Sequence, residues 1–106
     1  MAALLLMLLK ALPAEAASLA LVLAVDVSAS VTPDSYVLQR DGIARAFENA
    51  ALVQAISAAP DGIEVLVLEW SDPDKIEVTV GWTRVADRDS AAAFSAAVRA
   101  LSLIHI

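Results

Sequence analysis

The chain of 106 residues has no cysteine, only three glycines, and just seven lysine and arginine residues against thirteen acidic ones. Without cysteine there can be no disulfide bond, no thiolate zinc site and no lipid-attachment cysteine. The formal net charge of −6 argues against nucleic acid as a partner, because phosphate binding requires a basic surface. Since 59% of the residues are hydrophobic, general disorder is excluded, and the length suits one small domain.

The most informative segment is an apolar run, Leu19 to Val25, followed directly by Asp26, Ser28 and Ser30. A continuous apolar run ended by small polar residues predicts a buried parallel strand that opens into a loop. In open α/β sheets, ligands bind at such strand ends. One carboxylate and two hydroxyls at alternate positions are the hard oxygen ligands that Mg²⁺, Mn²⁺ or Ca²⁺ prefer. The alternative is that the serines only shape a strand-to-helix turn through local hydrogen bonds.

A helix is predicted to begin at Pro33, because Thr32 is a good N-cap and proline suits the first helical position. Tyr36, Ile43 and Phe47 share one face of this helix and are expected to pack into the core.

Further along the chain, the pattern predicts a short second helix, an antiparallel strand pair joined by a tight turn, and a final helix. The second strand of the pair alternates apolar and polar residues, which is typical of a half-exposed strand at a sheet edge. Asp87 or Asp89 is expected to cap the final helix. In chain order these elements cover residues 51–59, 63–70, 75–82 and 87–103.

Asp26, Ser28 and Ser30 form the pattern Asp-x-Ser-x-Ser, which resembles the opening motif of the metal-ion-dependent adhesion site (MIDAS) in von Willebrand factor A (vWA) domains. The resemblance implies an α/β fold of the vWA or Rossmann-like type, an open sheet with helices on both faces. Residues 18–100 correspond to its first half: strand, helix, antiparallel strand pair, helix. The first strand is therefore predicted to have one edge left unpaired.

The same resemblance implies roles for the three residues. Ser28 and Ser30 would bind the cation directly, and Asp26 would bind it through water or hold the serines in place. In vWA domains a threonine and an aspartate from two later loops complete the site, and no residue of this chain matches them. Affinity for Mg²⁺, Mn²⁺ or Ca²⁺ is therefore expected to be weak.

Four segments, 24–31, 39–42, 68–71 and 81–83, narrow the resemblance to a family of exported bacterial vWA-like proteins that is classed as a domain of unknown function. That family contributes a fold and a site but no known activity. The vWA resemblance implies an adhesion-type module, not an enzyme, whose cation binds an acidic side chain of a protein partner. One alternative is a phosphoryl-transfer enzyme with Asp26 as nucleophile. Haloacid-dehalogenase-like phosphatases carry the motif Asp-x-Asp at this point. In this chain Ser28 stands in place of the second aspartate, which is the usual general acid/base. Another alternative is a structural domain without metal.

The two ends of the chain each resemble a known type of segment. Residues 1–16 resemble a signal peptide, with an apolar core and the small-x-small cleavage site Ala14-Glu15-Ala16. The sequence thus predicts an exported protein, periplasmic or secreted. The apolar core is too short for a stable membrane span, which needs about 20 residues. Residues 101–106 resemble a translated sequencing adapter, in which case His105, the only histidine, has no functional meaning.

Overall fold

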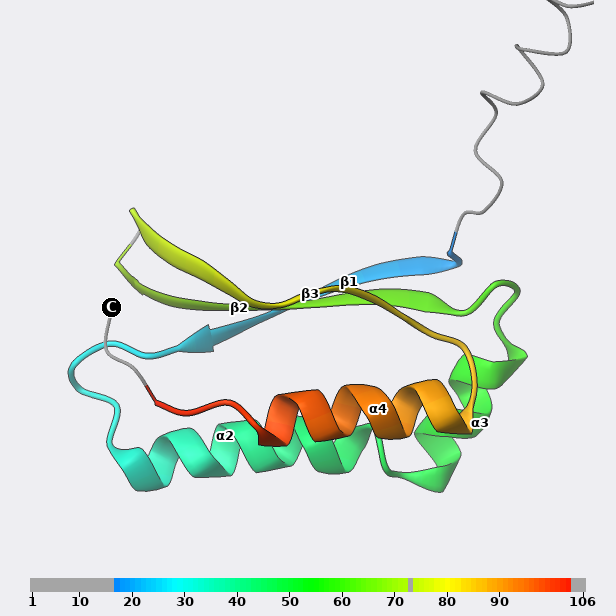
Figure 1. Ribbon diagram of the computed structural model, residues 1–106, viewed down its shortest axis with the longest axis horizontal. Helices are drawn as coiled ribbons and strands as arrows, with labels where there is room; N and C mark the ends of the chain where they lie inside the picture. The colour runs from blue at the N-terminus through cyan, green and yellow to red at the C-terminus, as the bar shows by residue number, and fades with distance from the viewer. Residues whose placement is uncertain (1–16, 73, 104–106) are drawn as a thin grey trace, which may run out of the picture.

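The computed structural model describes residues 17–72 and 74–103. Three strands form one mixed sheet, and three helices lie in a layer against it (Figure 1). The predicted α/β class is confirmed, and so is the order of the elements. Residues 1–16, expected to be a signal peptide, and His105 lie outside the described residues. The elements are β1 (Leu19–Asp26), α2 (Pro33–Ala46), α3 (Ala50–Ala58), β2 (Ile63–Asp72), β3 (Lys75–Val85) and α4 (Arg88–Arg99).

The sheet has the order β1-β2-β3, so β2 is central. β1 runs parallel to β2, with Leu19 opposite Ile63, and β3 returns antiparallel from a tight turn in which Asp72 pairs with Lys75. β1 and β3 are the edge strands of the described sheet, as the sequence predicts. The predicted burial of β1 is wrong for most of its length, because Val25 is the one buried residue of this strand and Leu19 and Val22 are about half-exposed. β3 is longer than expected and continues to Val85, with shifts of register against β2 on the way.

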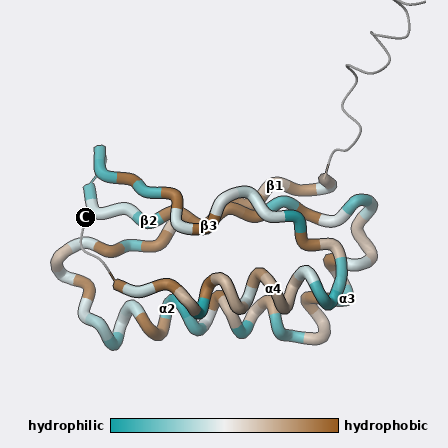
Figure 2. Tube along the Cα trace, in the orientation of Figure 1, coloured by the Kyte–Doolittle hydropathy of each residue, from teal (hydrophilic) through white to brown (hydrophobic). Residues whose placement is uncertain are grey.

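All three helices cover the same face of the sheet (Figure 1). The second layer of helices that a complete open sheet implies is not found within residues 17–72 and 74–103. The other face, here called the open face, therefore leaves large apolar side chains half-exposed where hydrophobic residues run along the strands (Figure 2). These residues are Val22, Trp70, Ile76, Val78 and Trp82.

The core lies between the sheet and the helix layer. Val65 and Val67 of β2 are fully buried, and Phe94 and Val98 of α4 are only 1% exposed. The rings of Phe47 and Phe94 meet at a centroid distance of 4.6 Å, which joins α2 to α4. Burying each such side chain stabilises the fold by about 1.5–3 kcal/mol.

Each helix begins at a residue whose side chain accepts a backbone N–H, which satisfies one of the unpaired donors of the first turn. Thr32 caps α2, Asn49 caps α3, and Asp87 caps α4 in a capping box with Ser90. Of the two aspartates predicted to cap the last helix, Asp87 is the one used. That helix ends at Arg99, although Leu101 and Leu103 beyond it still pack against the core.

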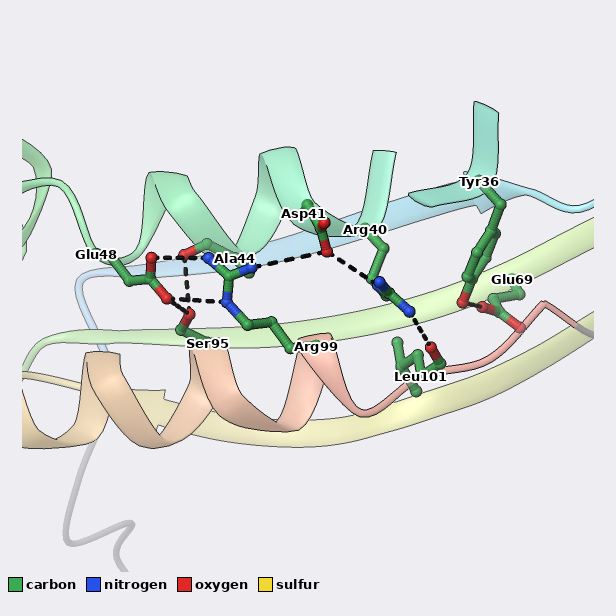
Figure 3. A network of polar contacts seen from close by, with 9 residues as sticks. All are labelled: Tyr36, Arg40, Asp41, Ala44, Glu48, Glu69, Ser95, Arg99 and Leu101. Carbon is green, nitrogen blue, oxygen red and sulfur yellow. Dashed lines mark hydrogen bonds and ion pairs between the residues drawn. The ribbon is translucent and has the colours of Figure 1, made fainter. Parts of the chain in front are cut away.

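A network of polar side chains joins α2 to α4 (Figure 3). Arg99 donates to both carboxylate oxygens of Glu48, at 3.1 and 2.8 Å, and lies 3.7 Å from Asp41. The buried Ser95 hydroxyl is 2.6 Å from Glu48 Oε2. The hydrogen bonds of Arg99, and then that of Ser95, lower the pKa of Glu48 to about 2. These contacts join α2 and the residues just after it to α4.

Candidate metal site

The candidate site is the loop that connects β1 to α2, and both of its ends are held by the fold. Val27 is fully buried, and its N–H donates to the Trp70 carbonyl oxygen at 2.9 Å. Val31 N–H donates to the Ser28 carbonyl oxygen, also at 2.9 Å. Thr32 then accepts the Ser35 N–H at 3.1 Å and starts α2. The loop is therefore a fixed turn at the carboxyl end of a parallel strand.

The structure brings the three predicted ligands together in this loop. Asp26 Oδ1 accepts the backbone N–H of Ser28 at 2.8 Å. The Ser28 and Ser30 hydroxyls are hydrogen-bonded to each other, with their Oγ atoms 3.1 Å apart. Asp26 and Ser28 are half-buried, while Ser30 is exposed, so the oxygen atoms can be reached from solvent.

This geometry fits a divalent cation. Mg²⁺ binds oxygen at about 2.0–2.1 Å in an octahedron, which places adjacent ligands about 3.0 Å apart, close to the 3.1 Å between the two serine hydroxyls. The hydrogen bond from the Ser28 backbone lowers the pKa of Asp26, so its carboxylate is ionised at neutral pH. The loop therefore offers a cation one charged carboxylate and two neutral hydroxyl oxygens.

A buried hydrogen bond ties the start of α2 to the sheet close to this loop, and the sequence did not reveal it. The Tyr36 hydroxyl donates to Glu69 Oε2 at 2.6 Å (Figure 3). Tyr36 and Glu69 are only 2% and 3% exposed. Burial, and then the bond to Glu69, raises the pKa of Tyr36. Sequence reasoning assigned Tyr36 to the core alone.

The signal that could have located Glu69 is its position in β2. It continues the alternation of Ile63, Val65 and Val67, all of which are buried against the helices. A carboxylate at such a position requires a donor, because burying an unpaired charge is costly. Glu69 thus has a positioning role for the helix that follows the loop.

A cavity lies at the other end of the helix layer, where the end of α2, α3 and the start of α4 meet; Figure 1 shows these elements. It has a volume of about 410 Å³. Its one carboxylate belongs to Glu48, whose oxygens already accept bonds from Arg99 and Ser95. In the described part of the chain, no three His, Cys, Asp or Glu side chains are grouped closely enough to hold a metal ion. The loop after β1 has no such group either, so it is a candidate only through one carboxylate together with two hydroxyl oxygens.

The fold and the loop together define a small α/β domain with an oxygen-rich turn after its first strand. The chain matches the family model described as "Protein of unknown function (DUF1194)" over residues 16–105, and it belongs to this family. The prediction that the chain belongs to a family of unknown function is confirmed. Comparison with curated proteins and with solved structures gives no match. Within the described residues, no helix has the length and apolar character needed to cross a membrane.

Proposed function

We propose that the loop after β1 binds a divalent cation, Mg²⁺, Mn²⁺ or Ca²⁺, through Ser28 and Ser30, with Asp26 holding the serines in place or binding through water. The observation that carries the proposal is the 3.1 Å separation of the two hydroxyls beside an ionised carboxylate. It agrees with the resemblance of the same residues to the vWA adhesion site. With three protein ligands, the dissociation constant for Mg²⁺ is expected to be on the order of 10⁻³ M.

The cation in turn would bind an acidic side chain of a protein partner. Three protein ligands leave coordination positions that water fills and that a carboxylate can take over. The chain itself carries a net charge of −6, so an acidic partner is repelled unless a cation lies between the two proteins. The function that we propose is therefore cation-dependent protein binding.

Titration with Mn²⁺, followed by electron paramagnetic resonance of the free ion, tests the cation site. We expect Ser28→Ala with Ser30→Ala to weaken binding about tenfold or more, because the cation loses two direct ligands. The matched control replaces Ser57 and Ser102, which are exposed serines outside the loop, with alanine. Equal affinity of the two double variants would refute the site.

The partner is tested by affinity capture from a bacterial periplasmic extract, in Mg²⁺ and in a chelator. Capture that needs Mg²⁺ and is lost in the variant lacking both loop serines supports the adhesion-type module. Release of phosphate from an aryl phosphate, abolished by Asp26→Asn but not by Asp61→Asn, would instead favour a phosphoryl-transfer enzyme with Asp26 as nucleophile.

We also propose that the protein is exported, to the periplasm or beyond the cell. Support comes from the apolar core and the cleavage pattern of residues 1–16. Expression of the full chain in a bacterium, followed by cell fractionation and N-terminal sequencing, should find a product that starts at Ala17. A cytoplasmic product that still begins at Met1 would contradict export.

A further inference from the structure

The cavity between the end of α2, α3 and the start of α4, here called the α3 cavity, has the size of a ligand pocket. Its volume is about 410 Å³, and a second hollow of about 210 Å³ shares Glu48, Val53 and Arg88 with it. Pockets that bind small molecules have volumes of about 300–1,000 Å³. The α3 cavity can therefore hold a small organic molecule.

Arg88 lines this cavity, and the fold gives its charge no partner. It is exposed and is the first residue of α4. Within the described residues its side chain makes no hydrogen bond or ion pair, even with its sequence neighbours Asp87 and Asp89. A cation in the first turn of a helix lies at the positive end of the helix dipole, which is unfavourable. Helix stability thus gives no reason for an arginine here, and its guanidinium is available to a ligand.

The remaining side chains around the cavity combine an apolar wall with one free amide. The wall consists of Phe47, Val53 and Ala92. The side chain of Gln54 on α3 also lines the cavity, and no hydrogen bond engages its amide in the described part of the chain. The Glu48 carboxylate, in contrast, already accepts hydrogen bonds from two side chains of α4. A ligand therefore meets one free guanidinium and one free amide beside apolar surface.

We propose that the α3 cavity binds a small organic monocarboxylate with an apolar body. The carboxylate would bind Arg88, because a planar guanidinium offers two parallel N–H donors that match the two carboxylate oxygens. The Gln54 amide would donate to the same group, and the apolar body would pack on Val53 and Ala92. The inference does not rest on the proposed cation site, which lies at the other end of the helix layer.

The charges near the cavity favour a single negative charge on the ligand. Glu48 lines the same cavity as Arg88, and Asp87 and Asp89 flank Arg88 in the sequence. The chain as a whole has a net charge of −6. A doubly charged phosphate is repelled more strongly by these groups than a carboxylate is.

Fluorine NMR of para-fluorobenzoate, titrated with the purified chain, tests the proposal. A chelator is present throughout, so that the carboxylate cannot bind through a cation at the loop after β1. We expect a dissociation constant on the order of 10⁻³ M for so small a ligand. Para-fluorobenzyl alcohol, which has the same body without the charge, should bind about tenfold or more weakly.

A matched pair of arginine variants tests the role of the guanidinium. Arg88→Gln should raise the dissociation constant about tenfold or more, because the charged hydrogen bonds are lost. Arg45→Gln is the control and should leave it unchanged. Arg45 is also exposed and also has no ion pair among the described residues, but it does not line the cavity. Circular dichroism should show that Arg88→Gln unfolds no earlier than the unchanged chain, since it removes a cation from the start of a helix.

A second pair of variants changes no charge. Ala92 and Ala93 are neighbouring exposed residues of α4, and Ala92 alone borders the hollow. Ala92→Leu should weaken binding several-fold because the added side chain occupies space needed by the ligand, and Ala93→Leu should not.

The contrary results are distinct. Failure to bind para-fluorobenzoate, or equal affinity of Arg88→Gln and Arg45→Gln, would overturn the site. Tighter binding of para-fluorophenyl phosphate would overturn the monocarboxylate class. Loss of benzoate binding in the variant lacking Ser28 and Ser30, with Arg88→Gln unaffected, would place the carboxylate at the loop after β1 instead. Loss of Mn²⁺ binding alone in that variant leaves the α3 cavity proposal standing.

Discussion

Replacing Tyr36 with phenylalanine tests whether its buried hydrogen bond holds α2 to the sheet. The substitution keeps the ring and removes the donor that lies 2.6 Å from Glu69 Oε2. Tyr36 is 2% exposed and Glu69 is 3% exposed, so water cannot replace the lost donor. A hydrogen bond to a charged group contributes about 1.5–3 kcal/mol. We therefore expect Tyr36→Phe to lower the free energy of unfolding by about 2 kcal/mol.

Thermal unfolding followed by circular dichroism gives the size of this effect. For a domain of this length, 1 kcal/mol corresponds to a shift in Tm of about 4–8 °C, so we expect a loss of roughly 8–16 °C. Glu69→Gln is the second arm of a double-mutant cycle. Its amide oxygen still accepts from Tyr36 but carries no charge, so adding Tyr36→Phe to Glu69→Gln should cost less than adding it to the unchanged chain. A loss below about 0.5 kcal/mol for Tyr36→Phe alone, within the range of ordinary surface changes, would refute the reasoning.

Three further predictions concern stability. Gly62→Ala should destabilise the fold by about 1–3 kcal/mol in urea unfolding, because Gly62 has φ +67° and an added Cβ would lie 2.5 Å from the Val85 carbonyl oxygen. Asp87→Ala removes the cap of α4 and should cost about 1 kcal/mol in the same assay. Acid should destabilise the protein partly through Glu48, since Arg99 lowers its pKa from 4.5 to about 2. That contribution is present above pH 4.5 and is lost as the pH falls toward 2, so Glu48→Gln should show a smaller drop in Tm across this interval.

The features that the sequence predicts well are those set by neighbouring residues. Thr32 followed by Pro33 marks the start of α2, and Asp26, Ser28 and Ser30 of the loop after β1 lie within five positions of one another. Their arrangement depends on a local turn, so spacing alone was sufficient to bring Ser28 and Ser30 together. The end of β3 was predicted three residues too early, at residue 82 instead of Val85.

The features that were missed depend on contacts between distant segments. Val80 packs against the core while Val78 is exposed, because shifts of register against β2 interrupt the simple alternation of β3. The bond from Tyr36 to Glu69 joins residues 33 positions apart. The bonds between Glu48 and Arg99 likewise require α2 and α4 to be packed first. Neither local propensity nor periodicity carries this information.

The parallel pairing of β1 with β2 has a consequence for the order of folding. β2 and β3 are joined by a tight turn and can form a hairpin in microseconds. β1 pairs with a strand that begins only at Ile63, so α2 and α3 must be placed before this contact can close, and such non-local contacts form slowly. The most apolar strand of the chain is thus the last to find its place in the sheet. Rapid dilution from denaturant at high protein concentration should therefore lose material to aggregation at this step, and slower addition should recover it.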